Sequence, residues 1–317
     1  MEGSLVTVFG ASGFIGRHIV RELAKRGARV NAVCRDVERA KFLKPMGVVG
    51  QVTPMRADVT DAAAIARAVD GATAVINLVG ILHPSGRNTF EAIQATAPGT
   101  IARAAKEAGA SRMVHISAIG ADAASQSLYA RSKAAGEEAV RAAFAGATIL
   151  RPSIVFGPND GFFNRFAAMA VLAPALPLIG GGRTRFQPVY VDDVADAVLA
   201  ALVTPDAIGE TYELGGPSVY SFEELLRMVL AETKRKCALL PMPFWLATFE
   251  AFFLEFLPSP PLTRDQVQLL KTDNVVSEGA KTLADLGIEA TPVEIVLPTY
   301  LDKFRPGGRY STGRQSI

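Results

Sequence analysis

The sequence predicts an α/β protein with a doubly wound parallel sheet and a smaller C-terminal α/β domain. Through residue 157, short apolar runs alternate with segments of helical periodicity, which is the pattern of a parallel sheet with crossover helices. The first apolar run ends in a glycine-rich turn that leads into a helix. Beyond residue 157, prolines and the glycine run at 180–182 break the alternation. We therefore expect a sheet domain at residues 1–157, with 186–216 returning to it, and a C-terminal domain at 158–185 and 217–317.

Each predicted strand is a compact apolar run between turn residues, as buried parallel strands are. The first helix follows from apolar residues at helical spacing between Ile15 and Leu23, and Gly27 ends it. Ser221 and Glu224 have the spacing of a capping box and should start a later helix. The expected strands cover residues 5–9, 29–34, 74–79, 112–117, 148–156 and 211–214. The next expected helices cover residues 96–108 and 126–143, and residues 189–203 are expected to form the edge of a strand followed by a helix.

The composition argues against several classes of function. The net charge is +2 and no basic stripe is present, so we expect no nucleic-acid partner. Cys34 and Cys237 lie far apart, which excludes a disulfide framework and predicts two buried thiols. No group of His, Cys, Asp or Glu has metal-ligand spacing, so no metal site is predicted. Asp192 and Asp193 are instead expected to cap a helix that begins near Val194.

The strongest local signal lies between the first strand and the first helix, where Gly10, Gly13 and Gly16 recur at the spacing Gly-x2-Gly-x2-Gly. Glycines permit a tight turn and let the backbone approach a pyrophosphate, while the helix N-terminus supplies unpaired N–H groups. At the start of an alternating strand–helix series, this spacing indicates a nicotinamide dinucleotide.

The end of the second strand distinguishes the two forms of that cofactor. An acid there would bind the ribose 2′-hydroxyl of NADH, but this chain has Arg35, followed by Asp36. Arg35, with Arg17 after the third glycine, can pair with a 2′-phosphate, so NADPH is predicted. In the alternative, Arg35 is solvated, Asp36 binds the ribose and the cofactor is NADH. Asp58 and Val59 are expected to border the adenine, or Asp58 is an N-terminal acid ahead of the helix at 62–69.

Several motifs follow one another along nearly the whole chain. They are Gly10-x2-Gly13-x2-Gly16, Asp58-Val59, Asn77-Leu-Val-Gly80, Tyr129-x3-Lys133, Leu150-Arg-Pro152 with Gly157-Pro158, and Tyr190-Val-Asp-Asp193. In this order they resemble the extended or atypical branch of the short-chain dehydrogenase/reductase superfamily. The resemblance implies a Rossmann fold with a C-terminal substrate domain, and it makes Tyr129 a general acid/base. The ammonium of Lys133 and the positive nicotinamide would lower the pKa of Tyr129 from its ordinary value near 10.

The third catalytic group of that superfamily is a hydroxyl after the strand that precedes the Tyr129 helix. Ser117 is the candidate, although in the extended branch the working hydroxyl falls one or two residues later, where this chain has Ala118 and Ile119. The substrate-polarising hydroxyl is therefore absent from its usual place. The resemblance assigns catalytic roles to Tyr129, Lys133 and Ser117. It assigns the cofactor site to Gly10, Ser12, Gly13, Phe14, Ile15, Gly16, Arg17, Arg35, Asp58, Val59, Leu78, Val79, Gly80, Ser117, Tyr129, Lys133, Pro152 and Ile154.

A narrower resemblance rests on the strings Arg185-Phe-Gln-Pro-Val-Tyr-Val-Asp-Asp, His115-Ile-Ser and Tyr129-Ala-Arg-Ser-Lys133. They are similar to the NADPH-binding accessory subunits of respiratory complex I (NADH:ubiquinone oxidoreductase) and their bacterial relatives. In that group NADPH is structural, the protein has no independent turnover, and its C-terminal domain lies beside the membrane arm. The resemblance implies complex I subunits and the membrane surface as partners. Because the first strand starts by residue 5, we expect no leader, and a cytoplasmic protein on the inner face of a bacterial cell membrane.

Residues 237–257 are rich in aromatic side chains and prolines. A membrane-spanning helix needs about 20 apolar residues with few charges, and Glu250 and Glu255 argue against one here. The segment is predicted either to contact a membrane surface or a partner, or to form a buried helix of the C-terminal domain.

Two functions remain open on the sequence. The first is a complex I accessory subunit that holds NADPH as a structural cofactor. The alternative is an NADPH-dependent reductase or epimerase, which could form homo-oligomers. Its substrate would be an apolar carbonyl compound, such as a quinone precursor or an isoprenoid or steroid-like molecule, or a nucleotide sugar.

Overall fold

The structure is a computed structural model that describes residues 1–258 and 260–308. It divides into two compact units. The first consists of Met1–Pro152, Val191–Leu214 and Ser277–Glu289, and the second of Ser153–Tyr190, Gly215–Val276 and the residues from Ala290 on. The limits at 152 and at 191–214 differ from the expected ones by a few residues, but the segment 277–289 was expected in the C-terminal domain and belongs to the first unit. The segment is held there because the main-chain N–H of Glu213 donates to the Lys281 carbonyl at 2.8 Å.

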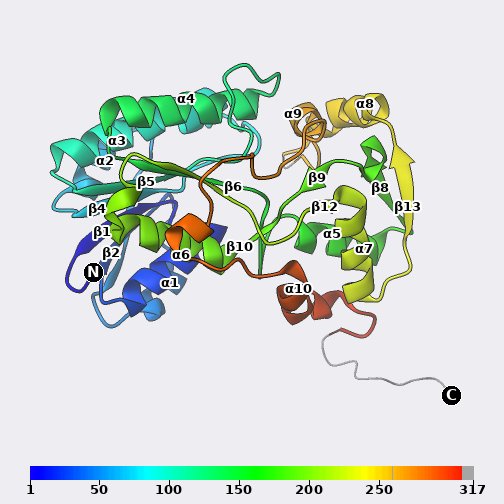
Figure 1. Ribbon diagram of the computed structural model, residues 1–317, viewed down its shortest axis with the longest axis horizontal. Helices are drawn as coiled ribbons and strands as arrows, with labels where there is room; N and C mark the ends of the chain where they lie inside the picture. Colours follow the sequence, from blue (N-terminus) through cyan, green and yellow to red (C-terminus); the bar gives the residue numbers. More distant parts are fainter. Residues whose placement is uncertain (259, 309–317) are drawn as a thin grey trace. The chain divides into compact units, whose positions relative to one another are not determined.

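The first unit contains a seven-stranded sheet in the order β3-β2-β1-β4-β5-β6-β11, in which every neighbouring pair is parallel. Helices α2, α3 and α4 cover one face of this sheet, and α1 and α6 cover the other (Figure 1). The predicted doubly wound parallel sheet is therefore confirmed. The strands are β1 Leu5–Phe9, β2 Arg29–Cys34, β3 Val52–Arg56, β4 Ala74–Asn77, β5 Arg112–Ile116, β6 Thr148–Pro152 and β11 Thr211–Leu214. The helices are α1 Phe14–Lys25, α2 Ala62–Val69, α3 Ala97–Glu107, α4 Leu128–Ala143 and α6 Val191–Val203. Shorter helical segments are η1 Lys41–Met46, the π-helical η2 Glu91–Thr96, η4 Pro205–Ala207 and η5 Ala284–Leu286.

Local side chains set several element boundaries that the apolar pattern could not place. The predicted strand 74–79 ends at Asn77, whose side-chain oxygen accepts the N–H of Val79 at 3.1 Å. The predicted helix 126–143 begins at Leu128, because the Ser127 hydroxyl caps it by accepting the N–H of Ala130. The strands predicted at 5–9, 29–34 and 211–214 are confirmed with the same limits.

Two sequence predictions about this part of the chain were wrong. The strand expected over 148–156 is broken after Pro152, because Ser153 turns away to donate its hydroxyl to the Asn274 side-chain oxygen at 2.7 Å. The helix expected near Val194 begins at Val191, so Asp192 lies in its first turn instead of capping it. Asp192 accepts from Arg21 of α1 at 2.6 Å, and so joins the two helices on that face of the sheet.

The second unit is built from short sheets and helices around a core of Phe and Leu side chains, in which Phe156, Phe163 and Phe222 are buried. The capping box predicted at Ser221 and Glu224 is confirmed at the start of α7. The strand pairs are β7–β10, β8–β13 and β9–β12. The strands are β7 Val155–Phe156, β8 Ala175–Ile179, β9 Arg185–Phe186, β10 Val189–Tyr190, β12 Tyr220–Ser221 and β13 Ala238–Met242. The helices are α5 Phe163–Leu172, α7 Phe222–Thr233, α8 Phe244–Leu254, α9 Arg264–Leu269 and α10 Val293–Leu301, with the short segments η3 Gly180–Gly182 and η6 Asp302–Phe304.

The aromatic segment forms strand β13 followed by helix α8 (Figure 1). Only Ala247 and Ala251 of α8 are buried, whereas Trp245 is 72% and Phe249 is 61% exposed. The alternative of a buried helix is therefore wrong. No helix in the described part of the chain is long and apolar enough to cross a membrane.

Of the two cysteines, Cys34 is buried as predicted, but Cys237 is only half-buried.

Candidate functional site

The turn between β1 and α1 places the backbone in a conformation that only glycine accepts. Gly10 has φ +82°, and a Cβ added there would lie 3.3 Å from the carbonyl carbon of Leu78. A Cβ at Gly16 would lie 2.3 Å from the Gly10 carbonyl oxygen, which is a severe overlap. Helix α1 begins at Phe14 after Gly13, and no side chain caps its first turn. The first N–H groups of the helix therefore keep their capacity to bind an anion such as a pyrophosphate.

Two guanidinium groups lie at the side of this turn where β2 ends. Neither Arg17 nor Arg35 forms an ion pair with any residue that the structure describes. Asp36, by contrast, accepts the main-chain N–H of Arg39 at 3.1 Å and lies 3.5 Å from its guanidinium. Asp36 thus has a local partner in Arg39, while both arginines remain available to a 2′-phosphate.

Asp58 and Val59 follow β3 at the same edge of the sheet. The Asp58 carboxylate accepts the N–H and the hydroxyl of Thr60 at 2.9 and 2.8 Å. These bonds, with a smaller contribution from the charge of Arg35, hold the pKa of Asp58 below its ordinary value. The side chain that caps α2 is Asp61, and Asp58 is an acid three residues ahead of that cap.

The loop after β4 is held in place by two amides. Asn77 accepts the N–H of Val79, and the side-chain oxygen of Gln94 accepts the N–H of Ile81 at 2.8 Å. A Cβ at Gly80 would lie 3.3 Å from the Nζ of Lys133, so the loop runs directly beside that ammonium. The sequence reasoning missed Gln94, because nothing in the pattern around η2 marks a side chain that holds a distant loop.

Tyr129 and Lys133 lie one turn apart on α4, as their spacing predicts. Lys133 is 5% exposed, and its ammonium donates to the Ile116 carbonyl at 3.2 Å and lies 5.9 Å from the centre of the Tyr129 ring. Burial lowers the pKa of Lys133 to about 8, an effect that the nearby Glu137 carboxylate partly opposes. The Lys133 ammonium therefore loses its proton at a pH nearer to neutral than an ordinary lysine does.

Without the nicotinamide, the chain does not lower the pKa of Tyr129. Burial raises the pKa of this half-buried phenol to about 12, and the Lys133 ammonium does not offset the burial. Loss of the phenolic proton removes a buried neutral group and creates a buried anion, which the surroundings disfavour. The chain by itself keeps Tyr129 protonated at neutral pH.

Ser117 follows β5 with 3% of its surface exposed, and its hydroxyl has no hydrogen-bond partner among the described residues. A buried polar atom without a partner costs about 1–3 kcal/mol, so it marks a place where a bound group can be accommodated. With the glycine turn and the two arginines, this hydroxyl fits a dinucleotide laid along the carboxyl edge of the sheet. Ala118 and Ile119 follow it and offer no side-chain hydroxyl.

The predicted site residues belong to one unit with a single exception. The positions after β1, β2, β3, β4, β5 and on α4 lie at one edge of the seven-stranded sheet, where its strand order reverses between β1 and β4. Pro152 ends β6 in the same unit. Ile154, however, belongs to the second unit and packs against the core around Phe156 and Phe163.

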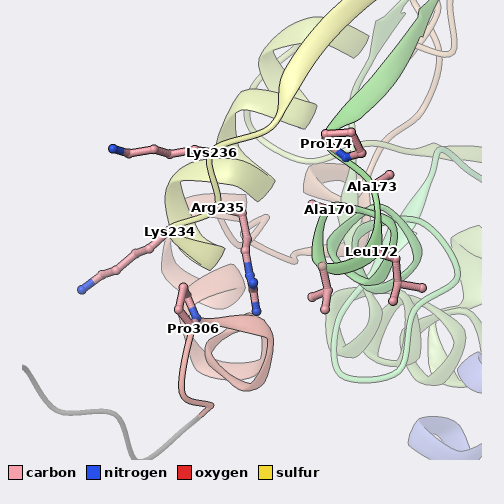
Figure 2. A pocket seen from close by; sticks show the side chains of 9 residues that line it. Ala170, Leu172, Ala173, Pro174, Lys234, Arg235, Lys236 and Pro306 are labelled. Carbon is pink, nitrogen blue, oxygen red and sulfur yellow. The ribbon is translucent and has the colours of Figure 1, made fainter.

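A separate open pocket of about 540 Å³ lies in the second unit (Figure 2). Its lining combines the end of α5 with the basic run after α7, and none of the predicted site residues takes part. The side chains of Lys234 and Lys236 point away from Leu172 and Ala173. Such cations at a helix C-terminus are explained by the helix dipole.

No group of three or more His, Cys, Asp or Glu residues in the described ranges could hold a metal ion.

Comparison with known proteins places this geometry in a family. The model of the NAD dependent epimerase/dehydratase family matches residues 6–215, which include every predicted site residue. The chain belongs to the NAD dependent epimerase/dehydratase family. This membership confirms the prediction of an extended short-chain dehydrogenase/reductase with a Rossmann fold and a nicotinamide dinucleotide cofactor.

The similarity of this chain to individual proteins extends beyond residues 6–215. NADH dehydrogenase [ubiquinone] 1 alpha subcomplex subunit 9, mitochondrial, of Arabidopsis thaliana is 38% identical over 97% of this chain and 80% of its own length. Ceramide reductase of Caulobacter vibrioides is 33% identical over 63% of this chain and 62% of its own length. A solved structure, MoeE5 in complex with UDP-glucose and NAD, shares the fold with a TM-score of 0.70, 20% identity, and coverage of 94% of this chain and 97% of that chain.

Proposed function

We propose that this protein is an accessory subunit of respiratory complex I that holds NADPH as a structural cofactor. The observation that carries the proposal is the similarity to the Arabidopsis thaliana complex I subunit over 97% of the chain. That similarity includes the second unit, with its exposed aromatic helix, and not only the dinucleotide-binding half. In bacteria the corresponding place is the inner face of the cell membrane, where the protein would attach peripherally.

The chemistry of the site supports retention of the cofactor over turnover. The pKa of Tyr129 lies at about 12, which disfavours its use as a base, and Ala118 and Ile119 stand where a substrate-polarising hydroxyl is usual. The turn at Gly10 to Gly16 would hold the pyrophosphate through main-chain N–H groups, and Lys133 would donate to the nicotinamide ribose. When bound, the cofactor would supply a hydride only if a substrate reached the nicotinamide.

Purification from native membranes in mild detergent tests the proposal as a whole. We expect about one NADPH per chain, identified by mass spectrometry of the released nucleotide, together with complex I subunits in the same fraction. A protein that emerges empty, free of complex I and associated only with itself would contradict the proposal.

The preference for NADPH should depend on Arg35. Its replacement by alanine removes a charge-assisted hydrogen bond worth about 1.5–3 kcal/mol, so NADPH affinity should fall at least tenfold while NADH affinity stays unchanged. Isothermal titration of both nucleotides measures the two affinities. Arg39→Ala is the matched control, because Arg39 is also exposed on the same segment but pairs with Asp36. Equal losses in both variants would point to a general charge effect and not to phosphate recognition.

Helix α8 and the residues just after it carry an exposed surface that we call the aromatic face, made of Trp245, Phe249, Phe252, Phe253 and Phe256, each between 43% and 76% exposed. The buried Ala247 and Ala251 fix the opposite side of the helix against Ile179 and Val267. Exposed apolar surface of this extent marks an interaction site in a soluble protein.

The occupant that best fits the aromatic face is a membrane interface. Aromatic side chains favour the level of lipid headgroups, and α8, with 11 residues, is about half the length that a span requires. Two cations lie nearby: the Arg264 guanidinium, which is paired with Glu255, stands 5.2 Å from the ring of Phe252, and the Lys271 ammonium stands 5.9 Å from the ring of Phe244. Cations beside interfacial rings are placed to contact anionic headgroups.

Substitution of three rings, as Trp245→Ser with Phe249→Ser and Phe253→Ser, should lower binding to lipid vesicles at least tenfold. The measurement is co-sedimentation with vesicles of mixed phosphatidylethanolamine and phosphatidylglycerol. A matched control replaces three other exposed apolar residues, Leu172, Val203 and Ile295, by serine. If both triple variants bind as the wild type does, the aromatic face contacts a protein and not the lipid.

The second candidate function is an NADPH-dependent reductase acting on an apolar carbonyl, favoured by the similarity to ceramide reductase. Tyr129, protonated at neutral pH, would then donate its proton to the carbonyl oxygen. Oxidation of NADPH in the presence of a long-chain ketone in detergent micelles, lost in Tyr129→Phe, would support this function.

A further inference from the structure

Phe42 has a position that neither the sequence pattern nor the fold requires. It lies in η1, and 42% of its surface is exposed although it is a large apolar residue. Its neighbours Ala40 and Leu43 are completely buried, so η1 is anchored on both sides of the ring. The segment therefore presents the Phe42 ring at the surface in a fixed orientation.

The ring faces Arg17, whose guanidinium carbon stands 5.2 Å from the ring centre. A second restraint comes from the turn itself, because the Nε–H of Arg17 donates to the Gly13 carbonyl at 3.3 Å. An arginine side chain that is free in solution loses about 2 kcal/mol of rotamer entropy when it is fixed. Here the stack and the hydrogen bond fix the guanidinium beforehand, and its terminal N–H groups remain without an ion-pair partner in the described ranges.

We propose that Phe42 is a positioning residue for recognition of the 2′-phosphate of NADPH, and that it acts by holding the Arg17 guanidinium. The inference rests on the proposed function, since it assumes that the chain holds NADPH. A planar guanidinium held against an aromatic face presents its remaining donors edge-on, which is the geometry for paired hydrogen bonds to phosphate oxygens. Because NADH lacks that phosphate, the contribution of Phe42 must appear for NADPH alone.

The test is a double-mutant cycle on the full chain, with dissociation constants for NADPH and NADH measured by isothermal titration. Phe42→Leu keeps an apolar side chain of similar volume but removes the π face. We expect it to weaken NADPH binding about two- to fivefold, which corresponds to an exposed cation–π contact, and to leave NADH binding unchanged. Phe42→Trp should restore the wild-type affinity for NADPH. In the Arg17→Ala background, Phe42→Leu should have no further effect on NADPH binding.

Unchanged NADH affinity in Phe42→Leu also shows that the variant is folded and that its glycine turn is intact. An equal loss for both nucleotides would overturn the inference, since it would mean that Phe42 only packs against the turn. The same loss with and without Arg17 would overturn it too, because Phe42 would then act independently of that residue. A wild-type chain that binds NADPH and NADH equally would overturn the proposed NADPH preference and this inference together. A wild-type preference for NADPH that is undiminished in Phe42→Leu would overturn the inference alone.

Discussion

Replacement of Arg151 by methionine is expected to destabilise the first unit by about 3–5 kcal/mol. Arg151 donates from Nε and Nη2 to the two carboxylate oxygens of Glu137 at 2.8 and 2.7 Å. The Glu137 side chain is 1% exposed, so removal of Arg151 leaves a buried charge without its main partner. The expected fall in Tm for a unit of this size is roughly 10 °C, measured by differential scanning calorimetry of the chain without cofactor.

Two control variants separate this effect from the loss of any surface ion pair. Arg26→Met removes the exposed pair with Asp196 in the same unit and should cost less than about 1 kcal/mol. The double variant Arg151→Met with Glu137→Leu removes both charges and should recover most of the lost stability. An Arg151→Met protein as stable as Arg26→Met would show that the Glu137 carboxylate has found other partners.

Replacement of Lys133 by methionine is expected to stabilise the chain without cofactor and to abolish retention of NADPH. Burial holds the pKa of Lys133 at about 8, against 10.5 for an ordinary lysine, so folding buries a charge that the unfolded chain keeps in water. Each pKa unit corresponds to 1.36 kcal/mol, and we expect methionine to add roughly 1–3 kcal/mol of stability at pH 7. The lost hydrogen bond to the nicotinamide ribose should lower NADPH affinity at least tenfold.

The pH dependence of stability identifies the cause. Below about pH 8 the lysine is charged in both states and the full cost of its burial is present. Between about pH 8 and 10.5 the unfolded chain binds the proton more strongly, so wild-type stability rises with pH in this window. Lys133→Met lacks that rise, and the difference in free energy of unfolding between the two proteins should shrink from pH 7 to pH 9.5. Urea unfolding at both pH values measures it, and a difference independent of pH would contradict this account.

Much of the first unit was predictable because its signals are local. The limits of β1, β2 and β11 follow from apolar runs between turn residues, and the glycine spacing at residues 10–16 is needed by a backbone that leaves no room for a Cβ. The motif that places Tyr129 four residues before Lys133 was likewise correct about the helix face. The spacing did not indicate that burial raises the Tyr129 pKa in the chain without cofactor, because burial is a property of the folded surroundings.

Other parts of the site have no local signal. Gln94 holds the loop after β4 through a contact that crosses from one element to another, and Phe42 meets Arg17 only because η1 packs beside α1. The segment 277–289 pairs with residues near 213, far away in sequence. Long-range contacts of this kind depend on how elements pack, which composition and periodicity do not encode.

The doubly wound sheet and the glycine turn could be predicted from the sequence without a structure. Periodicity and backbone freedom act within a few residues, and so they can be read without a structure. Packing in the folded chain was needed to show that Gln94 holds the loop after β4, that Lys133 is buried beside Gly80, and that the rings of α8 face outward. Each of these depends on which side chains come to share a place after folding, and that is set by packing between elements distant in the sequence.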